Sequence, residues 1–220
     1  MSLIELPFGL PGRIFRSPMP FGPYDLHGEV YNRFCEEQIA VIVLLASDEE
    51  CLHKTGCHLR ALYLEEGFQV LYLPIPDFSV PAKDDLEQAV QHTIAYAQAG
   101  HHIVIHCSAG IGRTGLFMAY LAKRCLGLTG AEALHWVRHF SPVLWKHQSN
   151  NSWYSMMSCK GHRAVGNLRL SSHDLHFLPQ HCPLTPDRGW LYACSVHSWR
   201  YAGRSSHDSL WHSPCAPCPS

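Results

Sequence analysis

The chain lacks any apolar segment long enough to cross a membrane. Its longest unbroken apolar run, residues 39–46, has eight residues, far short of the ~20 that a membrane-spanning helix needs. The N-terminus also lacks a basic stretch followed by an apolar one, so we expect no secretory signal. These absences exclude a membrane role and predict a cytoplasmic protein, in which a reactive thiol would stay reduced.

Residues 144–220 lack Glu and Ile, whereas the first 143 residues contain ten Glu and nine Ile. The same 77 residues hold 13 Ser, eight His, five Trp and five Cys, without helical or strand periodicity. We therefore expect a folded domain over residues 1–143, followed by an irregular and largely disordered tail. Three interpretations of the tail stay open: translation in a shifted frame, a disordered regulatory segment, or a metal-binding extension using Cys215 and Cys218.

The metal-binding interpretation has the least support. A single Cys-x-x-Cys pair without a second pair at zinc spacing is not typical of a zinc site. A His-rich composition is also weak support by itself. We accordingly predict no metal and no cofactor.

The most informative segment is residues 106–115, His-Cys-Ser-Ala-Gly-Ile-Gly-Arg-Thr-Gly. The apolar residues 103–105 precede it and a helix-like segment over residues 113–126 follows it, which predicts a strand, a loop and a helix N-terminus. Successive backbone N–H groups in such a loop can point inward, and the helix adds its positive end, so a phosphate dianion fits. The predicted phosphate-binding residues are Ser108, Ala109, Gly110, Ile111, Gly112 and Arg113.

Three side chains of this loop suit phosphoryl transfer to sulfur. The field that attracts a phosphate also stabilises a thiolate at Cys107, which makes it a nucleophile at neutral pH. Arg113 offers a planar, two-pronged donor for two phosphoryl oxygens, which a lysine could not match. Thr114 can donate its hydroxyl to the sulfur and so help Cys107 leave in a second step.

The leaving oxygen also needs a proton, and residues 73–81 contain a candidate donor. Asp77 follows a strand-like run and is bracketed by Pro76 and Pro81, whose fixed φ angles would hold a loop at the end of a strand. An aspartate near proline often only caps a turn or a helix. With the cysteine loop present, we favour Asp77 as the general acid.

At these residues the chain resembles the protein tyrosine phosphatase superfamily, and specifically its small dual-specificity-like members. The loop matches the family signature HCxxGxxR[ST], and Pro-Ile-Pro-Asp-Phe at residues 74–78 resembles the family's acid loop. The resemblance runs from about Gly12 to Val143. It implies the following catalytic roles: Cys107 as nucleophile, Arg113 as phosphate clamp, Asp77 as general acid and then base, and His106 and Thr114 as residues that tune the thiolate.

The substrate is less clearly indicated. Residues 108–112 contain no lysine, unlike the basic loops of inositol-lipid phosphatases, and residues 1–143 carry 10 Lys and Arg against 15 Asp and Glu. This balance argues against nucleic acid. We expect a monomer acting on phosphotyrosine in a protein or peptide, with phosphoserine and phosphothreonine left open. A catalytically silent phosphopeptide-binding module and a rhodanese-like sulfur transferase remain the alternatives.

The pattern of the first 143 residues predicts an α/β fold. Strands are expected over residues 12–16, 39–46, 68–73 and 101–106, and helices over 30–38, 47–66, 81–98, 113–126 and from Thr129, where Thr129 and Glu132 form a capping box. This alternation indicates a central, mostly parallel sheet flanked by helices, and the resemblance implies a cysteine-phosphatase fold. The active site would lie at the carboxyl ends of the strands.

The resemblance also bears on the tail. If residues 144–154 are back-translated and read from one base earlier, a permitted choice of codons yields Val-Glu-Thr-Pro-Glu-Gln-Gln-Gln-Leu-Val. This peptide resembles the Glu-Thr-x-x-Gln segment that opens the last helix of these phosphatases, at the expected position. We therefore favour the shifted reading frame for residues 144–220.

Overall fold

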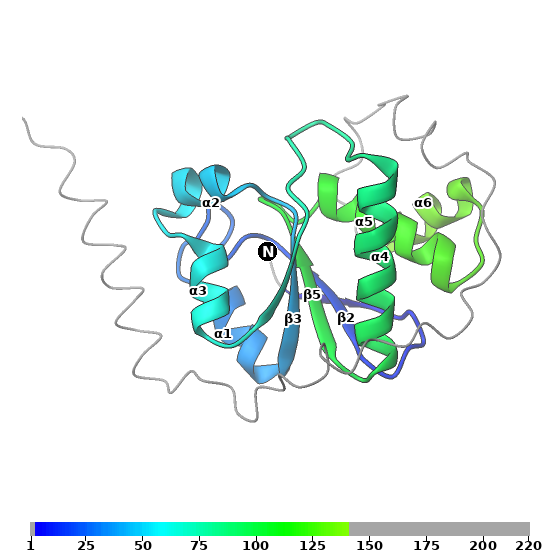
Figure 1. The fold of residues 1–220 in the computed structure, drawn as a ribbon, viewed down its shortest axis with the longest axis horizontal. Helices are drawn as coiled ribbons and strands as arrows, with labels where there is room; N and C mark the ends of the chain where they lie inside the picture. Colours follow the sequence, from blue (N-terminus) through cyan, green and yellow to red (C-terminus); the bar gives the residue numbers. More distant parts are fainter. Residues whose placement is uncertain (1–2, 141–220) are drawn as a thin grey trace, which may run out of the picture.

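The structure, a computed structural model, describes residues 3–140. They form a five-stranded sheet with helices on both faces (Figure 1). The strand order is β1-β2-β5-β3-β4, in which β1 is antiparallel and the other strands are parallel. The predicted α/β class and mostly parallel sheet are confirmed. The predictions for residues 144–220, including the Cys215 and Cys218 pair, lie outside the described residues.

The elements follow one another as alternating strands and helices. The strands are β1 (Ile4–Leu6), β2 (Ile14–Ser17), β3 (Ile39–Leu44), β4 (Gln69–Tyr72) and β5 (His102–His106). The helices are α1 (Glu29–Glu36), α2 (Asp48–Thr55), α3 (Leu59–Glu65), α4 (Lys83–Gln98), α5 (Gly112–Cys125) and α6 (Gly130–His139). No helix among residues 3–140 is long and apolar enough to cross a membrane.

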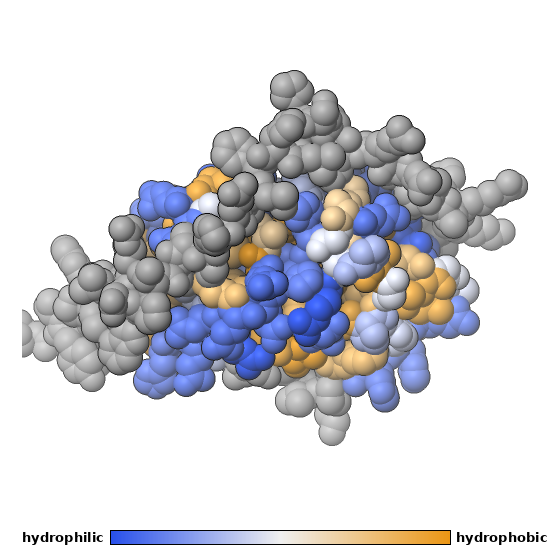
Figure 2. Space-filling model, turned by 90° about the horizontal axis from the view of Figure 1, so that it is seen from below, coloured by the Kyte–Doolittle hydropathy of each residue, from blue (hydrophilic) through white to orange (hydrophobic). Residues whose placement is uncertain are grey.

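The sheet is buried on both faces, as expected for parallel strands with continuous apolar runs. On β5, Ile103 and Ile105 pack with α4, α5 and α6, while Val104 packs against the opposite core under α1 and α3. The two layers are visible on either side of the sheet in Figure 1. Figure 2 shows the molecule from below, at the end where the parallel strands begin. Hydrophilic residues cover much of the described surface in this view.

Two details differ from the sequence-based prediction. Residues 47–66 form two helices, because Gly56 adopts a left-handed conformation (φ 72°) that ends α2. The short edge strand β1 was not predicted, since three residues are too few for a recognisable alternation. The capping box at Thr129 and Glu132 is confirmed, with both reciprocal hydrogen bonds formed.

Candidate active site

Cys107 follows directly after β5, the middle strand of the sheet, and is 3% exposed. The loop after it is compact because Gly110 adopts a left-handed φ of 69° and packs against the backbone of β2. A Cβ atom at Gly110 would lie 2.1 Å from the Ser17 carbonyl oxygen, so no other residue fits there without movement. The Met19 N–H also donates to the Ser108 carbonyl at 2.8 Å. The loop is therefore held in place by the segment that follows β2.

The backbone of this loop is available to an anion. The N–H groups of residues 108–111 donate to no other residue in the described part of the chain. The first N–H groups of α5, from Gly112 onward, are also without intrahelical acceptors, as at any helix N-terminus. The N–H groups of residues 108–113 belong to the predicted phosphate-binding residues, so the backbone offers a phosphate the donors that were expected from the sequence.

Arg113 is 3% exposed, and its guanidinium is oriented by a carboxylate that the sequence analysis did not consider. Glu50 of α2 accepts two hydrogen bonds, from Nη1 at 2.6 Å and Nη2 at 2.8 Å, and Nη1 also donates to the Ile75 carbonyl at 3.0 Å. An arginine has five N–H donors. The three bonds leave Nε–H and one Nη2–H, which lie along one edge and can bind two phosphoryl oxygens.

Glu50 stays ionised in this environment. Burial alone would raise its pKa, but the hydrogen bonds and charges of Arg113 and Lys54 outweigh burial and lower the pKa to about 2. Lys54, one turn further along α2, contacts Glu50 at 2.7 Å and donates to the Ser108 hydroxyl at 2.8 Å. A lysine thus reaches the loop from another element, although residues 108–112 contain none. Its charge is paired with Glu50.

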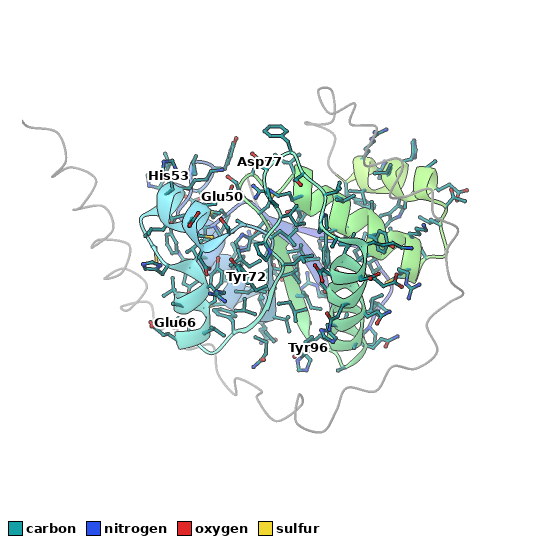
Figure 3. All side chains as sticks on the ribbon, turned by 45° about the horizontal axis from the view of Figure 1, so that its top comes forward. Glu50, His53, Glu66, Tyr72, Asp77 and Tyr96 are labelled. Carbon is teal, nitrogen blue, oxygen red and sulfur yellow. The ribbon has the colours of Figure 1, made fainter. Side chains whose placement is uncertain are left out.

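Asp77 lies at the same end of the molecule as Glu50 (Figure 3). Its carboxylate, 55% exposed, is 3.7 Å from Arg113 Nε at the edge left open by Glu50. The backbone N–H of Phe78 donates to the same carboxylate at 3.1 Å. The structure therefore brings the predicted acid close to the predicted phosphate clamp, although they lie 36 positions apart in the sequence.

His106 lies on the opposite face of the sheet from Cys107 and is fully buried. Its Nδ1 lies 3.1 Å from the Cys107 carbonyl and its Nε2 lies 3.0 Å from the Tyr63 hydroxyl. Because a carbonyl only accepts, Nδ1 carries the proton and Nε2 accepts from Tyr63. Burial lowers the pKa of His106 to about 4, so the ring is neutral and holds the backbone of Cys107.

Thr114 is buried in the first turn of α5, and its hydroxyl has no hydrogen-bond partner among residues 3–140. The predicted donation to the Cys107 sulfur is thus not formed in this structure and stays a prediction for the reacting state. Glu50, Lys54 and Tyr63 were missed by the sequence analysis. Their types are common on helices, and nothing in their local sequence distinguishes them.

Together the features above match what a cysteine-dependent phosphatase site requires, and they lie at the carboxyl end of a parallel sheet. Residues 25–125 match a family model described as "Polymorphic toxin system, DSP-PTPase phosphatase". Among curated proteins, laforin from Mus musculus is 41% identical over 57 residues, which are 26% of this chain and 17% of laforin. The tyrosine-protein phosphatase cdc-14 from Caenorhabditis elegans is 26% identical over 120 residues, 54% of this chain and 15% of that protein.

A solved structure, Tk-PTP in the active form, shares the fold with a TM-score of 0.52 and 25% identity, over 67% of this chain and 92% of that chain. These matches support the predicted resemblance of the domain to the small dual-specificity-like protein phosphatases. The chain spans less than half the length of the curated relatives named here. The comparisons favour a phosphatase over a sulfur transferase or a silent binding module.

Proposed function

We propose that the chain hydrolyses phosphotyrosine in proteins or peptides through a cysteinyl-phosphate intermediate. The observation that carries the proposal is the convergence of Cys107, the open edge of Arg113 and the Asp77 carboxylate at one end of the sheet. These groups come from two separate segments, the cysteine loop and the loop that carries Asp77. Their assembly is what an enzyme needs, whereas a binding module would need only the loop and the arginine.

In the first step, Cys107 Sγ attacks phosphorus while the bond from phosphorus to the leaving oxygen breaks. Asp77 donates its proton to that oxygen, and the loop N–H groups with Arg113 bind the three equatorial oxygens. In the second step, Asp77 takes a proton from water, the water oxygen attacks phosphorus, and the sulfur–phosphorus bond breaks. Inorganic phosphate leaves and Cys107 returns as a thiolate.

Phe78 supports a preference for an aromatic substrate. It directly follows the acid, is 69% exposed, and adopts a left-handed φ of 58°. Such a conformation is strained for a bulky residue, and strained residues gather at functional sites. The exposed ring beside Asp77 provides a surface against which the ring of phosphotyrosine can pack. Phosphoserine and phosphothreonine have no aromatic ring to make this contact.

The test has two arms in the full chain. Release of phosphate from para-nitrophenyl phosphate is expected, and formation of thiocyanate from thiosulfate is not. Peptides that differ only in phosphotyrosine, phosphoserine or phosphothreonine then give the preference, and Phe78→Ala should lower kcat/KM for the phosphotyrosine peptide alone. Tight phosphopeptide binding without any turnover would overturn the proposal in favour of a binding module.

The proposed setting follows from the chemistry. Cys107 is free and has to remain a thiol, so we place the enzyme in a reducing compartment such as the cytoplasm. Phosphorylated protein is the only partner that the mechanism requires, and we propose a monomer without metal or cofactor. Size-exclusion chromatography with light scattering, and activity after dialysis against a chelator, test these two points.

A further inference from the structure

A second arginine, Arg16 of β2, is buried without a described partner. The residue is 7% exposed. Its guanidinium forms neither a hydrogen bond nor an ion pair with any residue from 3 to 140. Because a buried guanidinium is costly without a compensating anion, a group that carries negative charge is expected close to it.

The sheet register identifies that group. Arg16 pairs with Ile105 on the neighbouring strand β5, and Cys107 lies two residues further along on the same face as Ile105. One strand spacing and two residues of rise separate Arg16 from Cys107, roughly 8 Å between Cα atoms. An arginine side chain can cover that distance. Burial lowers the pKa of Arg16, while the negative charge of Cys107 acts in the opposite direction.

The position of Arg16 relative to the loop is fixed. The residue after it, Ser17, contacts the backbone of Gly110, and Met19 is hydrogen-bonded to Ser108. These contacts tie the carboxyl end of β2 to the phosphate loop. These backbone contacts therefore fix the position of Arg16 relative to the loop.

Carboxylates near this strand are already engaged elsewhere. Glu5 on β1 pairs in register with Phe15 rather than Arg16, and it binds Arg13 at 2.7 Å. Glu50, the carboxylate at the loop, binds Arg113. Cys107 is thus the group close to Arg16 that can carry a compensating negative charge.

We propose that Arg16 is a positioning residue that stabilises the Cys107 thiolate from the β2 side of the loop. It adds a fixed positive charge to the field of the loop N–H groups and the α5 N-terminus. This inference deepens the proposed function and rests on it. It assigns a role in catalysis to a strand residue outside the cysteine loop and the acid loop.

The test measures the sulfur without any substrate. The full chain is alkylated with iodoacetamide at pH 5, and the modification is read by mass spectrometry on the peptide that carries Cys107. Iodoacetamide is uncharged, so the loop does not attract it as it would attract an anionic reagent. The rate of alkylation therefore depends on the fraction of Cys107 that is thiolate. Arg16→Met should slow alkylation of Cys107 by about three- to tenfold, the effect of one removed charge after the gain in intrinsic nucleophilicity is subtracted.

Two variants separate charge from structure. Arg16→Lys should stay within about twofold of wild type because it keeps the charge. Arg33→Met removes an arginine that is 46% exposed on α1 and should leave the rate unchanged. Circular dichroism checks folding, and Arg16→Gln carries the same test if the methionine variant does not fold.

A folded Arg16→Met or Arg16→Gln protein that alkylates at the wild-type rate would overturn the proposal. So would equal slowing in the lysine variant, since that indicates a structural role. Phosphate release by the wild type is scored separately. A failure of the proposed function therefore cannot be mistaken for a failure of this inference.

Discussion

Replacing Glu50 by glutamine tests whether the carboxylate on α2 holds Arg113 in its working orientation. Glutamine keeps the shape and one acceptor but removes the charge and one of the two bonds to the guanidinium. The pKa of Glu50 is about 2 in the folded chain, against ~4.3 for an ordinary glutamate, which corresponds to about 3 kcal/mol of folding free energy at neutral pH. For a domain of this size, a loss of that order lowers the Tm by about 10 °C.

The sign of the pH dependence follows from the lowered pKa. A carboxyl group whose pKa falls on folding stabilises the protein above its unfolded value, and this contribution is lost as the pH falls through the folded value. The difference in unfolding free energy between wild type and Glu50→Gln should therefore be full at pH 7. It should shrink between roughly pH 4 and pH 2. Urea unfolding at a series of pH values measures it.

Activity should fall together with stability, because in the proposed mechanism Arg113 binds phosphate through the edge that Glu50 leaves open. Misplacement of such a group by about 1 Å costs roughly 10²-fold, so we expect kcat/KM to drop by roughly 10- to 100-fold. Glu49→Gln is the matched control, since Glu49 occupies the same turn of α2 and forms no ion pair with a described residue. If Glu50→Gln matches Glu49→Gln in kcat/KM and Tm, the orienting role of Glu50 is refuted.

Four further predictions concern the mechanism and the chain's extent. Cys107→Ser should abolish turnover while keeping affinity for phosphate, because the loop N–H groups and the arginine clamp survive; a serine variant with more than about a few per cent of wild-type activity contradicts the mechanism. Asp77→Asn should lower kcat by roughly 10²–10⁴ and flatten the basic limb of the bell-shaped pH profile of kcat/KM, and an unchanged profile would identify another acid. Tyr63→Phe leaves buried His106 Nε2 without its donor and should cost about 1–3 kcal/mol in urea unfolding; a neutral result would show that this hydrogen bond is dispensable. Truncation after Val143 should leave kcat/KM within a few-fold, since every group named above precedes it, and sequencing codons 140–154 checks the shifted frame directly.

The sequence by itself predicted the architecture correctly, and it indicated the chemistry of the cysteine loop. Cys107 and Arg113 lie on one short loop, with an apolar strand before it and a helix after it. Their relative placement is therefore set by local geometry. Continuous apolar runs and the capping box at Thr129 likewise depend on neighbours in the chain. These features were predictable because the residues that create them are contiguous.

Tertiary structure alone decided how the site is supported. Glu50, Lys54 and Tyr63 lie on helices α2 and α3, 43 to 63 residues before their partners in the cysteine loop. Arg16 reaches the neighbourhood of Cys107 only because β2 pairs with β5, a strand far from it in the sequence. No periodicity encodes such contacts. A parallel sheet brings the carboxyl ends of strands that are distant in sequence to one edge. Strand order and register decide which side chains meet there. Both follow from the packing of the two helical layers rather than from any single segment.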